Sequence, residues 1–215
     1  MALRGRAGAI QAPEWFGSAA RGNAFLPSLM GAYSILYSAW WPFAWGSAGA
    51  VAFLLVLAAA VLFIVRGTLQ VRHATLFPNN PTPEDQRISN AMGLLNSITH
   101  PIWMLGAILL LVFGQGRWVL PLMVFVIGAH FIPMGRIFGR QIDYVLGPIA
   151  MAAAVVAGVL ARDDEVSWLV VFAVAGVGGT LATLSYAFYM TRAYLRLCER
   201  AGVPFPLAKS AVAPG

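Results

Sequence analysis

The stretch VSWLVVFAVAGVGGTLATLSYAFYMT, residues 166–191, contains no charged residue. At about 1.5 Å per residue, a helix of this length exceeds the ~30 Å hydrocarbon core of a bilayer. Small residues recur in it every four positions, at Ala175, Gly179 and Thr183. Membrane helices associate through close backbone approach at such residues, because apolar side chains gain nothing from leaving lipid. The stretch therefore predicts a transmembrane helix that packs closely against its neighbours.

Five further apolar segments precede this one, so the chain has six in all. They cover residues 24–41, 46–66, 91–113, 118–137 and 143–161. Of the 215 residues, 60% are hydrophobic and only 10% are charged, whereas soluble domains carry about 25% charged residues. This composition excludes a soluble globule. It predicts an all-α integral membrane protein whose six transmembrane helices form three antiparallel hairpins.

The basic residues predict the orientation of these helices. With the N-terminus in the cytoplasm, 12 of the 14 basic residues lie on the cytoplasmic side, and only Arg117 and Arg162 lie outside. The positive-inside rule then places both termini in the cytoplasm. The predicted parts are a cytoplasmic tail over 1–23, a membrane domain over 24–191 with a cytoplasmic loop over 67–90, and a cytoplasmic extension over 192–215. We expect a multi-pass protein of a bacterial inner (plasma) membrane.

The formal net charge of +6 suggests an anionic partner. The arginines lie at the ends of apolar segments, and no basic patch is interleaved with aromatic residues as in single-strand nucleic-acid binding. We therefore expect the bilayer and its anionic headgroups at the cytoplasmic face as the partner, and no nucleic acid. A membrane-protein partner or a homo-oligomer is a further expectation. The single cysteine, Cys198, excludes an intramolecular disulfide and any CxxC motif.

Two histidines lie inside neighbouring apolar segments. His100 is about 13 Å into the helix that begins near residue 91, and His130 is about 9 Å from the same side of the membrane. Ser89, Gly93, Asn96 and His100 share one helix face. Because ionisable groups inside a membrane usually face the bundle interior, we expect Asn96, His100 and His130 to line a shared polar cavity.

Two other interpretations of the histidines remain open. In the first, they serve only as hydrogen-bond partners between helices and satisfy the carbonyl groups that Pro101 and Pro133 leave free at Ser97 and Ala129. Alternatively they form a haem b or metal pair, although neither has a carboxylate or thiolate near it in the sequence. No metal site is predicted apart from this haem alternative.

The stretch GRIFGRQID, residues 135–143, ends the fourth segment with three charged residues. One interpretation is that Arg136 and Arg140 anchor the helix end among anionic headgroups, with Asp143 as their ion-pair partner. Asp143 is also placed to begin the next helix as a cap. The functional alternative is an anion or headgroup site in which Arg136, Arg140 and Asp143 close the histidine cavity on its cytoplasmic side.

Catalytic motifs are absent from the sequence. It contains no Walker A motif, GxSxG elbow, HExxH or GxGxxG. Apart from Asp143, at the start of a segment, the acidic residues lie outside the apolar segments, which argues against a proton-coupled carrier. The sequence therefore favours a non-enzymatic protein that binds or passes a small amphiphile or ion, or an accessory subunit of a membrane assembly. The alternative is a haem- or quinone-binding redox protein that uses His100 and His130.

Overall fold

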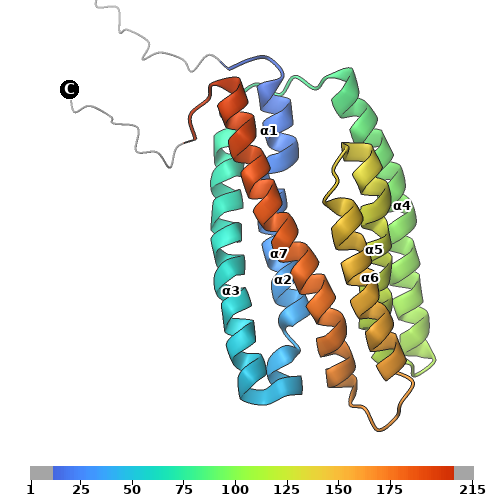
Figure 1. Cartoon of the computed structure of the whole chain (residues 1–215). Helices are drawn as coiled ribbons and strands as arrows, with labels where there is room; N and C mark the ends of the chain where they lie inside the picture. The colour runs from blue at the N-terminus through green and yellow to red at the C-terminus, as the bar shows by residue number, and fades with distance from the viewer. Residues whose placement is uncertain (1–11, 206–215) are drawn as a thin grey trace, which may run out of the picture.

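A computed structural model describes residues 12–205, which form seven α-helices and one short 3₁₀ helix (Figure 1). The elements are α1 (Phe16–Ala24), α2 (Leu26–Ser38), α3 (Trp41–Ala74), α4 (Pro83–Val112), η1 (Gly116–Trp118), α5 (Val119–Phe138), α6 (Asp143–Leu160) and α7 (Trp168–Ala201). No strand occurs in this range. The prediction of an all-helical chain is confirmed.

Five helical stretches are long and apolar enough to cross a membrane: α3, α4, Gly116–Phe138, α6 and α7. Each coincides with one of the predicted segments, so the chain has the helices of a multi-pass membrane protein. The side of the membrane on which each end lies stays a prediction.

The first predicted segment, 24–41, is divided in the structure. α1 ends at Ala24 and α2 begins at Leu26, with Pro27 in its first turn. A proline cannot donate a backbone hydrogen bond to the preceding turn, and this interrupts the helix. Phe25 keeps right-handed helical angles, so α1 and α2 follow one another along the bundle (Figure 1). The predicted tail 1–23 therefore contains most of α1 in the part that the structure describes, residues 12–23.

The predicted loop over 67–90 is wrong in its extent. α3 continues to Ala74 and α4 begins at Pro83, so only residues 75–82 connect them. The reason is that the end of α3 buries an amphipathic face, including Gly67 and Gln70, that hydropathy does not detect. Thr82 begins α4 with a capping box, in which its side chain and that of Asp85 each accept a backbone N–H. The last helix likewise extends to Ala201, into the predicted extension 192–215, and residues 1–11 and 206–215 lie outside the described residues.

α7 is the central helix of the bundle. It contacts α1, α2, α3, α5 and α6, whereas α4 packs against α5 at the edge. The sequential pairs α2–α3, α4–α5 and α6–α7 are all in contact, as three hairpins require. In Figure 1, α3 lies on one side of α7, α4, α5 and α6 lie on the other, and α7 crosses in front of α1 and α2.

Glycines set the spacing between α7 and its neighbours. A Cβ atom at Gly176 would overlap the carbonyl oxygen of Tyr37 on α2, and one at Gly178 would overlap Ala153 on α6. At Gly179, a Cβ atom would lie 2.6 Å from the Tyr37 ring. The prediction that α7 packs closely at Gly179 is confirmed. These three glycines of α7 allow close contact with both α2 and α6.

Aromatic and charged side chains join the loops at the end of the bundle away from both described termini. The ring of Trp40 lies 5.7 Å from that of Trp168, and Trp41 Nε1 donates to the Ala173 carbonyl over 3.1 Å. Arg117 pairs with Asp164 at 2.7 Å and donates to the Val166 carbonyl. The loops of all three hairpins are therefore fixed at this end by specific contacts.

Topology can be tested with reporter fusions. Fusions within 78–84 and after Lys209 should report the cytoplasm, and fusions within 114–116 should report the outside, because of the asymmetry of the basic residues. The measurement is the activity of a paired phosphatase and fluorescent reporter at each site. An external signal from 78–84 would contradict the predicted orientation of every hairpin.

The central packing can be tested with single alanine substitutions. Gly176→Ala should lower the free energy of unfolding by about 1–3 kcal/mol or more, because the new methyl group overlaps backbone that cannot move alone. Gly93→Ala on α4 is the matched control, since a Cβ atom there meets nothing within 4 Å. Thermal unfolding in mild detergent measures both, and Gly179→Leu should behave like Gly176→Ala. Equal stabilities of the Gly176 and Gly93 variants would show that close approach is not what holds α7.

Candidate functional site

The two histidines predicted to share a cavity have different surroundings. His130 is half-buried on α5, and its Nδ1 lies 3.0 Å from the hydroxyl of Thr99 on α4. His100 is exposed, and its Nδ1 lies 3.1 Å from the Asn96 carbonyl of its own helix. Asn96 is exposed as well. Thr99, rather than Asn96 or His100, is the polar residue that α4 directs at α5.

Asn96 and His100 therefore do not line a cavity with His130, because they do not lie on the face of α4 that contacts α5. A small hollow of about 240 Å³ between α4 and α5 contains Thr99 and His130, but neither Asn96 nor His100. Its other lining residues are apolar or proline. The principal contacts of α4 are with α5 and η1. Most of the α4 surface is therefore exposed, including the face that carries Ser89 and His100.

The residues predicted to close that cavity lie elsewhere. Arg136 is exposed at the end of α5. Arg140 is half-buried in the turn before α6, and it donates to the hydroxyl of Tyr186 on α7 at 2.5 Å and to Asn23 Oδ1 on α1 at 3.2 Å. Arg140 thus ties three parts of the chain together within the bundle instead of anchoring a helix end among headgroups.

Asp143 is neither an ion-pair partner nor a cap. It is the first residue of α6 and is completely buried, yet neither carboxylate oxygen has a hydrogen-bond partner among the described residues. The only ion pairs in residues 12–205 are Arg87–Glu84 and Arg117–Asp164. Both interpretations of Asp143 from the sequence are therefore corrected, and a fully buried acidic residue is present where none was expected.

A second set of buried polar side chains lies at the same end of the bundle. Nδ1 of His73 lies 2.8 Å from the hydroxyl of Tyr194, which donates to the Gln70 carbonyl over 3.1 Å. The rings of Phe77 and Phe205 lie 5.2 Å and 5.3 Å from the His73 ring. The sequence did not predict this set, because its residues fall in the predicted loop 67–90 and the predicted extension 192–215. The spacing of Gly67, Gln70 and Ala74 is the helical signal that would have revealed it.

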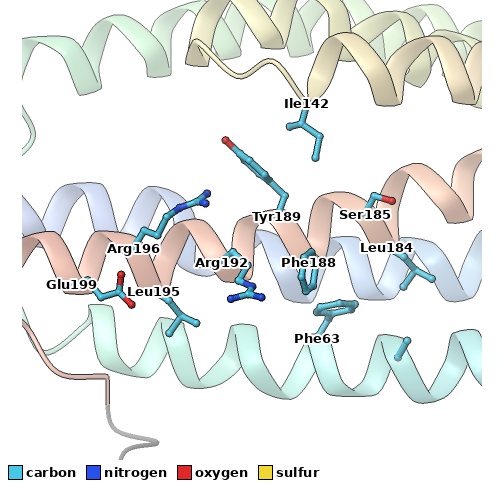
Figure 2. A pocket seen from close by; sticks show the side chains of 11 residues that line it. Phe63, Ile142, Leu184, Ser185, Phe188, Tyr189, Arg192, Leu195, Arg196 and Glu199 are labelled. Atoms are coloured by element: carbon cyan, nitrogen blue, oxygen red, sulfur yellow. The ribbon is translucent and has the colours of Figure 1, made fainter.

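A surface groove with a volume of about 810 Å³ runs along α7 (Figure 2). Small-molecule sites typically have volumes of about 300–1,000 Å³, so the groove is large enough for a ligand. Its lining residues are Ala59, Phe63, Ile142, Leu184, Ser185, Phe188, Tyr189, Arg192, Leu195, Arg196 and Glu199. Most come from α7, two come from α3, and Ile142 comes from the turn before α6.

The groove changes from apolar to cationic along its length. Phe63, Leu184 and Phe188 form one end, and Arg192 and Arg196 lie one and two turns further along α7 (Figure 2). The guanidinium carbon of Arg192 lies 5.3 Å from the Phe188 ring centre, and that of Arg196 lies 5.8 Å from the Tyr189 ring centre. Neither arginine forms an ion pair with a carboxylate within residues 12–205, although Glu199 lines the far end.

The position of the groove along α7 can be compared with the thickness of a bilayer. Counted from Trp168 along α7, Leu184 is about 24 Å away and Arg192 about 36 Å away. A hydrocarbon core of about 30 Å that begins at Trp168 would contain the apolar end of the groove and would place the arginines at headgroup level. The sequence places a residue of this groove at every fourth position of α7: Leu184, Phe188, Arg192 and Arg196. This spacing predicts that they share one helix face, but it does not predict the groove beside that face.

Comparison of the chain with protein-family models, with curated proteins and with solved structures gives no match. No group of three or more His, Cys, Asp or Glu residues within 12–205 is placed to hold a metal ion. The functional argument therefore depends on the geometry of the groove and of the buried polar residues.

The role of the histidines can be tested by stability. His130→Ala should lower the free energy of unfolding by about 1 kcal/mol, because it removes a hydrogen bond between α4 and α5 within the membrane. His100→Ala is the control and should change stability little, since its hydrogen bond stays within one helix. Thermal unfolding measures both variants, and an equal loss in the two would contradict the assignment of Thr99 as the partner of His130.

Proposed function

We propose that this multi-pass membrane protein binds an anionic amphiphile in the groove of α3 and α7. The groove supports this proposal because it joins an apolar end to two arginines that have no carboxylate partner among the described residues. An acyl or other apolar chain beside Phe63, Leu184 and Phe188 would place an attached phosphate or carboxylate beside Arg192 and Arg196. The proposed function is binding or passing such a molecule, without a chemical reaction.

The charge pattern favours an anionic over a zwitterionic headgroup. A guanidinium group binds phosphate or carboxylate through paired hydrogen bonds, and each basic residue near an anionic surface contributes about 1 kcal/mol. Arg66 adds a third cation beside the groove, since it lines a neighbouring hollow that shares Leu195 and Glu199 with the first. Glu199, at the far end, would repel a second negative charge there, which favours a compact headgroup.

Binding can be measured on the purified full chain in nanodiscs of phosphatidylcholine that contain a fluorescent phosphatidylglycerol. We expect the double variant Arg192→Gln/Arg196→Gln to weaken binding roughly thirty-fold, from the loss of two such contacts. Arg200→Gln is the matched control, because Arg200 is exposed on the same helix but does not line the groove. Equal weakening by Arg200→Gln, or equally tight binding of a fluorescent phosphatidylcholine, would overturn the proposal in favour of general surface attraction.

The apolar end can be tested separately in the same assay. Ala59→Phe should reduce binding by filling the groove, whereas Ala58→Phe should not, because Ala58 is exposed on α3 and does not line the groove. If both variants bind like the unchanged protein, the apolar chain of the ligand does not occupy this groove.

A further inference from the structure

Asp143 differs from every other acidic residue of the chain. The eight acidic residues all lie within the described residues, and Asp143 alone is buried. Its side chain is completely inaccessible, and both carboxylate oxygens lack a hydrogen-bond partner there. An ionised carboxylate in this state is among the most unfavourable arrangements in a protein, because it loses its water without replacement.

The start of α6 supplies no hydrogen bond to replace this loss. A carboxylate in the first turn of a helix usually accepts a free backbone N–H. Here the N–H of Tyr144 donates to the Gln141 carbonyl, and those of Val145 and Leu146 donate to the Ile142 carbonyl. The backbone donors nearest to Asp143 are therefore already committed.

The nearest cation is committed as well. Arg140 is three residues away, but its guanidinium donates to Tyr186 and Asn23 instead of Asp143. Among the described residues, the titratable groups beside the carboxyl group are Arg140 and, on α7, Tyr186. Arg136 at the end of α5 is exposed. Both the Arg140 charge and the positive end of the α6 dipole oppose binding of a metal ion at this site.

We infer that Asp143 is a proton-binding site, and that Arg140 exchanges partners when the proton leaves. In the observed arrangement the carboxyl group is neutral and holds the proton. Its release gives one proton to water and one carboxylate, and nothing is oxidised or reduced. The new charge attracts Arg140, which gives up its bonds to Tyr186 and Asn23 and so loosens the link from the α5–α6 turn to α1 and α7. This inference is independent of the proposed amphiphile groove.

Infrared spectroscopy of the full chain in neutral-lipid nanodiscs, without added amphiphile, tests the proton site. Exposed carboxyl groups titrate at about pH 4, so a protonated carboxyl band that persists well above this pH should come from Asp143. Asp143→Asn should remove this band. Asp85→Asn is the matched control and should keep it, because Asp85 is half-buried but accepts hydrogen bonds from Thr82 and Ser18. Absence of such a band in the unchanged protein, or its survival in Asp143→Asn, would overturn the inference.

The same titration tests the exchange of Arg140. Tyr186→Phe removes the hydroxyl that holds Arg140 away from Asp143, so the midpoint of the band should fall by about one pH unit. Arg140→Gln removes the cation that would stabilise the carboxylate, so the midpoint should rise. Tyr186→Phe retains the ring that packs 5.5 Å from Phe131, so it decides the question even if Arg140→Gln fails to fold. An unchanged midpoint in Tyr186→Phe would overturn the exchange.

Discussion

The arrangement of the bundle depends on the close approach of α7 to helices on both of its sides. Gly176 and Gly179 face Tyr37 of α2, and Gly178 faces Ala153 of α6. In lipid, apolar contact alone does not drive association, so van der Waals contact at these small residues must hold the helices together. α4 shows the contrast, because its contact with α5 at Gly106 is made through the flexible Leu122 side chain. α4 accordingly lies at the edge of the bundle, and Asp85 also connects it to α1 through Ser18.

The groove and the buried polar residues both lie beside α7, after the last of its closely packed small residues, Thr183. After Thr183, α7 continues with Leu184, Tyr186, Phe188 and Tyr189, whose side chains do not permit such close approach. One face of this section lines the groove, and Tyr186 on another face receives Arg140. Both polar features therefore lie beside the section of α7 that follows Thr183.

Hydropathy predicted the positions of the helices well where the helix is apolar along its whole length. Segment 118–137 corresponds to α5 (Val119–Phe138), and segment 143–161 corresponds to α6 (Asp143–Leu160). It failed for α1 and for the ends of α3 and α7, where mixed polar and apolar residues pack against other protein segments. The inner face of α4 was also missed, because Thr99 and His100 are adjacent in sequence and differ by about 100° around the helix. Only the packed structure distinguishes them, since both are polar residues in an apolar segment.

The arginines show why the candidate site in particular could not be predicted. Counting basic residues orients the chain, and each arginine contributes equally to that count. In the structure, Arg21 donates to the Phe77 carbonyl, Arg117 pairs with Asp164, and Arg140 donates to Tyr186. These bonds hold segments of the protein together, whereas Arg192 and Arg196 lie over aromatic rings beside the groove and form no side-chain hydrogen bond or ion pair within residues 12–205. A guanidinium whose donors are already used inside the protein cannot bind a ligand without breaking those bonds. The distinction between structural and ligand-binding arginines therefore depends on which carbonyl, hydroxyl and carboxylate groups the fold brings within reach of each one.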